Sequence, residues 1–180
     1  MTIGPRDILD FWTDSVGEKR WYVVEPVLDD EVRARYENLW RAARDGKLSD
    51  WESTAEGALA LLIVLDQFPR NMFRGKADAF ATDAQARGVA DRAIANGFDL
   101  KIEPPLRQFF YLPFEHSENM ADQNRSVALF AGRMGKDHYT HPYAMEHRAE
   151  IERFGRFPSR NAQLGRASTP EEAEFLRRKA

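Results

Sequence analysis

The sequence predicts an all-α fold, and three observations support this prediction. Apolar residues recur at helical spacing in most segments, for example at Val32, Tyr36 and Trp40, which share one stripe of a 3.6-residue period. No segment shows a convincing two-residue alternation of the kind that indicates a strand. Helix-capping patterns and glycines separate the periodic segments. We count seven or eight helices, and the short loops between them favour stacked antiparallel hairpins.

The first two helices are expected before residue 46. Pro5 is suited to the first turn of a helix, and an apolar patch from Ile8 to Trp12 follows it. Asp29 is expected to cap the second helix, because a carboxylate there accepts hydrogen bonds from free backbone N–H groups. Gly46 is expected to end that helix in a left-handed conformation.

The most apolar stretch of the chain, residues 58–65, is expected to form the central helix. Ser53 and Glu56 match the capping-box pattern just before it. Its apolar residues surround the helix, so it needs neighbours on several sides. We expect Pro69 to end it, because the residue before a proline is displaced from helical conformation.

A helix of small residues and a short aromatic helix are expected next. Thr82 and Gln85 match a second capping box, and Gly97 is expected to end the helix that follows. Pro104 is expected to start the aromatic helix and Pro113 to end it.

Three helices are expected in the last third of the chain. Ser117 is expected to cap a long helix, and another runs from about residue 142 to residue 154, before Gly155. Thr169 and Glu172 enclose a proline in a strong capping pattern for the last helix.

The composition limits the class of protein. The chain has 180 residues, enough for a single domain spanning 1–180. A net charge of only -3 argues against a nucleic-acid or membrane-surface protein. No apolar run approaches the roughly 20 residues of a membrane span, and Asp7 and Asp10 interrupt any signal peptide. With no cysteine, the sequence predicts a cytoplasmic protein.

The first polar cluster follows the central helix and comprises Asp66, Gln67, Arg70 and Asn71. Buried polar groups must find partners, because an unpaired one costs roughly 1–3 kcal/mol. One interpretation is a structural turn in which Arg70 crosslinks loops. The other is a cleft in which Arg70 binds an anion with two hydrogen bonds.

The second polar cluster contains Glu115, His116, Glu118, Asp122 and Arg125. A histidine beside a carboxylate is the arrangement that general acid–base catalysis uses. The catalytic candidates are therefore His116, Glu118 and Asp122. The alternative is an ordinary helix start, with acids favoured near the N-terminus and Arg125 in a local ion pair.

The third polar cluster combines His147 and Arg148 with an arginine-rich segment near the end of the chain. Four arginines fall there without an acid among them: Arg153, Arg156, Arg160 and Arg166. Such a group suits a phosphate or carboxylate, or it pairs with the acids upstream. Arg160 and Asn161 end a segment that resembles residues 68–71. No zinc motif, phosphate loop or dinucleotide fingerprint is present, so we predict neither a metal nor a cofactor.

The motifs LDQFPRN, at residues 65–71, and LPFEHSE, at residues 112–118, resemble the bacterial family known as domain of unknown function 924. The resemblance covers nearly the whole chain. It implies a fold similar to tetratricopeptide-like helical repeats and implies no activity. Three residues depart from the family pattern. They are Thr13, Glu115 and Asn124, where an aromatic, an apolar and an acidic residue are expected.

Three hypotheses about function follow. The first is a helical module with a concave pocket that binds an anionic small molecule or an acidic peptide end. Its ligand-binding candidates are Asp66, Gln67, Arg70, Asn71, Arg125, His147, Arg148, Arg160 and Asn161. The second is a hydrolase- or transferase-like enzyme that uses His116 on a negatively charged substrate. The third gives the polar clusters a purely structural role and places function in a protein contact or a homodimer. The first hypothesis requires the segments near residues 70 and 160 to meet.

Overall fold

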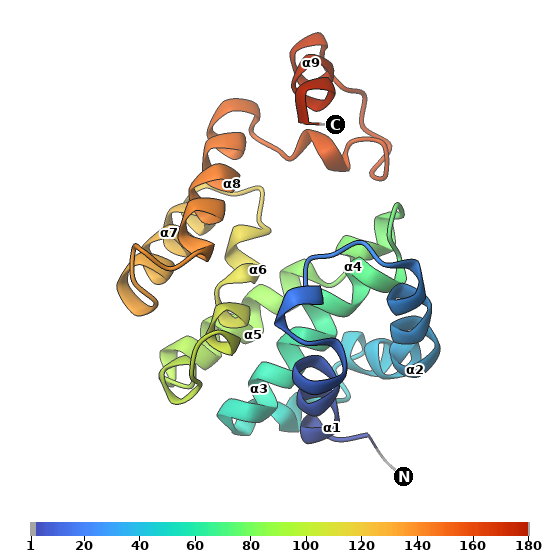
Figure 1. Ribbon diagram of the computed structural model, residues 1–180, viewed down its shortest axis with the longest axis vertical. Helices are drawn as coiled ribbons and strands as arrows, with labels where there is room; N and C mark the ends of the chain where they lie inside the picture. Colours follow the sequence, from blue (N-terminus) through green and yellow to red (C-terminus); the bar gives the residue numbers. More distant parts are fainter. Residues whose placement is uncertain (1–2, 180) are drawn as a thin grey trace. The chain divides into compact units, whose positions relative to one another are not determined.

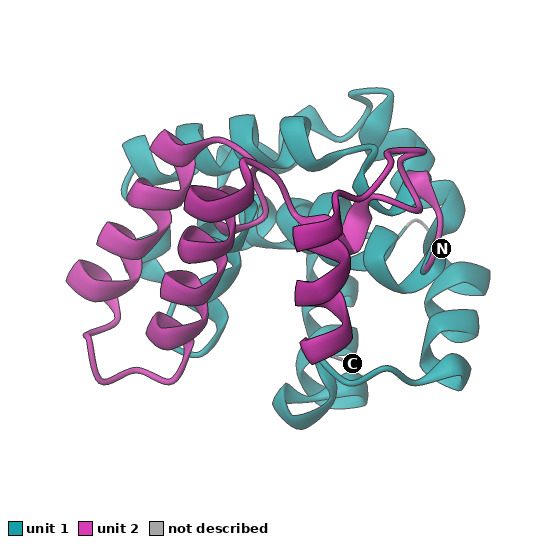
Figure 2. Cartoon of the chain, turned by 90° about the horizontal axis from the view of Figure 1, so that it is seen from above, with its two compact units in different colours: residues 1–74, 78–113 teal, residues 75–77, 114–180 magenta. Residues whose placement is uncertain are grey.

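The computed structural model describes residues 3–179, which fold into helices joined by turns (Figure 1). No strand occurs within these residues, and the predicted all-α class is confirmed. The chain divides into two compact units, coloured separately in Figure 2. Unit 1 comprises residues 1–74 and 78–113, and unit 2 comprises residues 75–77 and 114–180. None of the helices in the described residues is long and apolar enough to cross a membrane.

Unit 1 is built around one buried helix, α3. Its helices are α1 (Pro5–Asp10), α2 (Pro26–Arg44), α3 (Ala55–Leu62), α4 (Phe68–Met72) and α5 (Asp83–Ala95). As expected for a helix that is apolar all round, α3 packs against both α1 and α5. Every side chain from Ala58 to Leu65 is buried. The predicted central position of this segment is therefore confirmed.

The helix does not end at Pro69, contrary to the prediction. It widens into a π-helical turn, Ile63–Gln67, and continues as α4. The Phe68 N–H donates to the carbonyl of Ile63, five residues back, and Pro69 then occupies the first turn of α4. A proline is tolerated there because its missing N–H has no partner to lose. The wide turn thus lets the chain accept a proline without leaving the helix.

Aromatic rings fill the space beside this turn. The Phe68 ring stacks on Tyr36 with centroids 4.8 Å apart and meets Trp12 at 5.7 Å. Phe11 packs against Tyr36 at 5.0 Å. Phe11 and Trp12 stand at the start of a second π-helical segment, Phe11–Val16, which follows α1. The apolar patch after Pro5 therefore belongs to the core of unit 1.

Several predicted caps lie one or more residues from the actual helix ends. Thr54 rather than Ser53 caps α3, with its hydroxyl accepting from the Gly57 N–H. Thr82 does not cap α5 through its side chain. It accepts a hydrogen bond from the Trp40 indole and donates to the Leu65 carbonyl instead. Thr82 therefore links α2, the π-helical turn and α5 inside the core.

Unit 2 contains a hairpin of two helices followed by a third helix (Figure 2). The hairpin consists of α7 (Met120–Arg133) and α8 (Thr140–Phe154), which pack along each other. The short α6 (Leu112–Glu115) spans the boundary between the units. Asn119 caps α7, where Ser117 was expected. Gly155 ends α8 in the left-handed conformation, as predicted, with φ 68°.

The last helix, α9 (Pro170–Lys179), begins with the predicted capping box. The Glu172 carboxylate accepts from the Thr169 N–H at 2.7 Å, and the Thr169 hydroxyl accepts from the Glu172 N–H at 3.2 Å. Short 3-10 turns connect the helices elsewhere. They include Glu18–Arg20, Ser49–Ser53, Ala77–Phe80, Asp99–Lys101, Leu106–Phe110 and Pro158–Arg160.

The close approach of a backbone carbonyl to Gly57 gives the first prediction. A Cβ at Gly57 would lie 2.2 Å from the Trp51 carbonyl oxygen, whereas one at Gly88 meets only the flexible end of Arg92 at 3.3 Å. Alanine normally favours a helix by about 1 kcal/mol over glycine. We expect Gly57→Ala to lower the free energy of unfolding and Gly88→Ala to raise it. Urea unfolding followed by tryptophan fluorescence checks this, because all four tryptophans lie in unit 1. Equal gains for both variants would contradict it.

Candidate functional site

Arg70, the arginine predicted to hold an anion, is enclosed by acids of unit 1. Its guanidinium contacts both Asp83 oxygens, at 2.9 and 3.2 Å, and lies 3.3 Å from an Asp66 oxygen. It also donates to the Asp66 carbonyl at 2.6 Å. Asp66 is only 1% exposed. Two buried or nearly buried carboxylates therefore offset the charge of Arg70, which favours the structural interpretation of this cluster.

The other residues of the first cluster are also bonded within unit 1. The Gln67 amide donates to Asp66 at 2.6 Å, and the Asn71 amide donates to Asp29 at 2.8 Å. Arg74 donates two further bonds to Asp29, at 2.7 and 2.9 Å. The prediction that Asp29 caps α2 is wrong, because α2 begins at Pro26 and Glu25 is its N-cap. Asp29 instead joins α2 to α4 and the residues after it.

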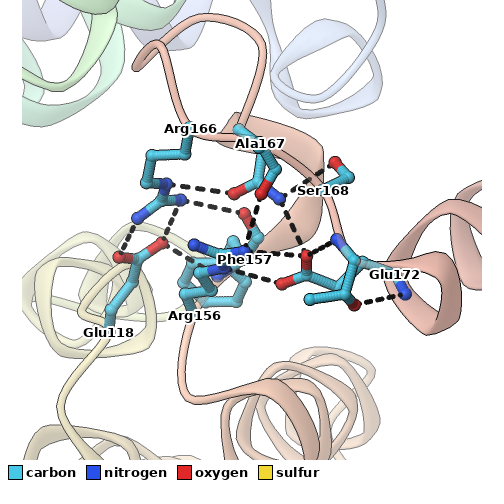
Figure 3. A network of polar contacts seen from close by, with 9 residues as sticks. Glu118, Arg156, Phe157, Arg166, Ala167, Ser168 and Glu172 are labelled. Carbon is cyan, nitrogen blue, oxygen red and sulfur yellow. Dashed lines mark hydrogen bonds and ion pairs between the residues drawn. The ribbon is translucent and has the colours of Figure 1, made fainter.

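The predicted catalytic residues His116, Glu118 and Asp122 all belong to unit 2. Both carboxylate oxygens of Glu118 accept hydrogen bonds from the Arg166 guanidinium, at 2.7 and 2.9 Å (Figure 3). Glu118 also accepts a hydrogen bond from the Phe157 N–H at 2.8 Å. Despite its partial burial, the Arg166 guanidinium and the Phe157 N–H hold the pKa of Glu118 below its usual value. Asp122 accepts from the Ser117 hydroxyl at 2.6 Å. These contacts fix two carboxylates of the trio to structural partners, and a dyad with His116 stays a prediction.

A second ion pair lies in the same network. Arg156 donates to both oxygens of Glu172, at 2.6 and 2.8 Å (Figure 3). The Arg156 hydrogen bond, with the Thr169 N–H, lowers the pKa of Glu172 to about 2. Asn161, a predicted ligand-binding residue, is buried and accepts from Arg166 at 3.0 Å. The segment from Arg156 to Thr169 is therefore held in place by charge-assisted hydrogen bonds.

His147 lies on α8 and has a defined tautomer. Its Nδ1 is 2.8 Å from the Tyr143 carbonyl oxygen and 3.2 Å from a Glu115 carboxylate oxygen. Both neighbours are acceptors, so Nδ1 carries the proton and Nε2 presents its lone pair. Burial lowers the pKa of His147 to about 4, and the nearby positive charges of Lys179 and Arg160 and the His116 ring act in the same direction. The ring is therefore neutral at pH 7, and its side chain is 37% exposed.

Arg160 and His147 share one aromatic ring. The Arg160 guanidinium lies 4.5 Å from the Phe157 centroid, a cation–π contact. The His147 ring meets the same ring edge-on, with centroids 5.6 Å apart. We call His116, His147, Phe157 and Arg160, together with Glu115, the His147 cluster. All of its members belong to unit 2.

Two other predicted arginines of unit 2 have different neighbours. Arg125 lies over the Phe114 ring at 4.3 Å. Arg148 donates to the side-chain oxygen of Asn124 at 2.6 Å, and an oxygen of the exposed Glu152 is 3.7 Å away. Asn124 stands where the resemblance led us to expect an acid, and Arg148 here binds a neutral amide.

Sequence reasoning missed one member of the His147 cluster as a functional residue and named a different histidine for another. Glu115 was expected to act beside His116 in an acid–base site, and its carboxylate contacts His147. Phe157 was treated as part of a loop. Its position between Arg156 and Arg160 was an available signal, because arginines often stack on aromatic rings. Among residues 3–179, no group of three histidine, aspartate or glutamate side chains could hold a metal ion.

The fold and these contacts define an all-helical protein of two compact units with paired arginines and one partly exposed histidine cluster. Residues 8–180 match the model of a family described as bacterial protein of unknown function, DUF924, and the chain belongs to this family.

One solved structure is similar over nearly the whole chain. It is that of ATU0120, a protein of unknown function from Agrobacterium tumefaciens, with 43% sequence identity and a TM-score of 0.90. The match covers 96% of each chain. No curated protein matches the chain.

The Arg70 contacts give the second prediction. Arg70→Met removes the partner of two carboxylates, and breaking a buried pair in this way costs about 3–5 kcal/mol. Arg74→Met breaks a pair whose arginine is 41% exposed, and such pairs contribute about 1 kcal/mol or less. Urea unfolding monitored by tryptophan fluorescence compares the two variants. Similar losses of unfolding free energy in the two variants would show that Arg70 is not a structural residue.

The lowered pKa of Glu172 gives the third prediction, which concerns acid. Its ordinary pKa is 4.5 and its folded value is about 2, so the carboxylate stabilises the fold above pH 4.5. That contribution is lost as the pH falls towards 2. We expect the NMR signal of the Thr169 amide, which donates to Glu172, to shift in this range. Glu172→Gln should be less stable at pH 7 and should lose less stability on acidification. An unchanged acid profile in this variant would contradict the prediction.

Proposed function

We propose that unit 2 binds a small anion at the His147 cluster. The observation that supports this proposal is the joint packing of Arg160 and His147 on the Phe157 ring. Arg160 supplies a permanent positive charge and His147 supplies a partly exposed imidazole beside it. An anion between them would receive charge-assisted hydrogen bonds from both groups once His147 takes up a proton.

The charge of Arg160 beside His147 favours an anion. This charge opposes protonation of the ring and would stabilise a negative ligand in the same place, whereas the charge of Lys179 is already paired with Glu150 at 2.8 Å. Glu115 lies 3.2 Å from Nδ1, and Nε2, on the other side of the ring, is the atom offered to the ligand. A bound anion should therefore raise the pKa of His147.

This proposal narrows the set of residues expected from the sequence. We assign Arg70, with Asp66, Gln67 and Asn71, to the structural role, because their side chains are bonded inside unit 1. We assign Arg166 and Asn161 to the same role in unit 2. Arg160 and His147 are the ligand-binding residues of the proposal. A pocket that joins the segments near residues 70 and 160 is no part of it, and location in the cytoplasm stays a prediction from the sequence.

A second candidate function is acid–base catalysis on the bound anion, and the tautomer of His147 favours it. The Tyr143 carbonyl and Glu115 orient the ring through Nδ1, which leaves Nε2 as the base. The base of this candidate is therefore His147 with Glu115, in place of His116 with Glu118 or Asp122. A pKa near 4 makes a weak base. An anion that raises this pKa would bring it closer to neutral pH, where a general base is most effective.

The fourth prediction tests anion binding with sulfate, which keeps its charge between pH 7.5 and 4.5. In the free protein, the NMR signals of the His147 ring should complete only about a quarter of their titration by pH 4.5, because its pKa is about 4. With saturating sulfate, the ring should titrate inside the range, and sulfate should bind more tightly as the pH falls. Arg160→Gln should weaken binding by roughly tenfold or more, since a hydrogen bond to a charged group contributes about 1.5–3 kcal/mol.

The matched control for this experiment is Arg153→Gln. Arg153 is an exposed arginine of the same unit, paired with Glu171 at 2.7 Å. The Arg153→Gln variant should bind sulfate with the same affinity as the unmodified protein. If sulfate leaves the His147 titration unchanged, and Arg160→Gln behaves like the control, the His147 cluster is not an anion site.

A further inference from the structure

We infer that the ligand of the His147 cluster is an anion attached to a planar aromatic ring, and that Tyr143 stacks on that ring. This inference rests on the proposed function and names its ligand class. It starts from an exposed aromatic side chain beside the cluster, which the anion site itself does not use.

Tyr143 and His147 are neighbours on the surface of α8. They are four residues apart, a spacing that brings two side chains onto one face of a helix, with Cβ atoms about 5–6 Å apart. The His147 side chain folds back over this turn of the helix, since its Nδ1 lies 2.8 Å from the backbone carbonyl oxygen of Tyr143. The Tyr143 side chain is 56% exposed. A large aromatic ring in solvent therefore lies one helical turn from the histidine.

The positions of Tyr143, His147 and Arg160 favour a ligand that has an anionic group and a second, apolar part. Side chains on a helix lean towards its N-terminus, so the Tyr143 ring extends along α8 away from His147. An anionic group held by His147 and Arg160 would leave the rest of the ligand to follow this face of the helix. A flat ring suits Tyr143, because aromatic rings prefer offset stacking on one another.

An aliphatic chain would gain less from this surface. It would cover the Tyr143 ring without the stacking contribution of about 0.5–1.5 kcal/mol that aromatic pairs have beyond the area they bury. The inferred ligand class is therefore the aromatic or heteroaromatic phosphates, sulfates, sulfonates and carboxylates.

The fifth prediction compares two sulfonates that differ only in their apolar part. Naphthalene-2-sulfonate and methanesulfonate are both monoanions between pH 4.5 and 7.5, and NMR titration gives their dissociation constants. The aromatic sulfonate should bind the unmodified protein roughly tenfold more tightly. Tyr143→Ala should remove this advantage and leave methanesulfonate binding unchanged. Tyr143→Phe should keep the advantage, because stacking needs the ring and not the hydroxyl.

The control for unspecific stacking is Tyr22→Ala, which removes another exposed tyrosine, 56% exposed and located in unit 1. It should keep the full preference for the aromatic sulfonate. Equal affinities for the two sulfonates, or a preference that survives Tyr143→Ala, would overturn the inference. The proposed function would then stand if sulfate binding still depends on Arg160. If neither sulfate nor either sulfonate binds, the proposed function and this inference both fail.

Discussion

The bidentate ion pair between Glu118 and Arg166 determines where the His147 cluster forms. Glu118 also accepts from the Phe157 N–H, and Phe157 is the ring on which both His147 and Arg160 pack. The segment after Gly155 has little regular helix until α9 begins, so backbone hydrogen bonds alone do not hold it. Charged side chains perform that task, and a chain that leaves a carboxylate partly buried must provide it with a cation.

The same constraint explains why the arginines paired with buried or half-buried acids are unsuited to bind a ligand. Arg70 is committed to Asp83 and Asp66, Arg156 to Glu172, and Arg166 to Glu118. An anion that displaced one of these carboxylates would leave it unpaired in a poorly solvated place. The concentration of arginine in the sequence therefore reflects the need to neutralise acids more than a capacity to bind substrate. Arg160 packs on the Phe157 ring, on which the neutral His147 ring also packs.

The features that the sequence predicts well depend on neighbouring residues. The buried helix α3, the capping box of Thr169 and Glu172, and the end of α8 at Gly155 all follow from patterns within a few positions. Several of the predictions that failed concern local choices that distant residues decide. Thr82 is a good capping residue by type, yet Trp40 and Leu65 engage its hydroxyl. The partners of Glu118 lie 39 and 48 residues away along the chain, and no sequence pattern indicates such a pairing. The contact between Glu115 and His147 could not be predicted for the same reason, because the two residues lie far apart in the sequence.

The π-helical turn before Pro69 has a consequence for evolution by deletion. Such a turn amounts to one extra residue in a regular helix, and each residue advances the direction of a side chain by about 100°. Removing one residue between Ile63 and Gln67 would restore ordinary helical geometry, and the backbone would accept the change. Because each residue of the wide turn advances by less than this angle, the turn already absorbs the extra residue, and Arg70 would keep nearly the same direction relative to the preceding helix. The loss of one residue would therefore preserve the contact between Arg70 and Asp83 and would remove one buried side chain of the turn instead.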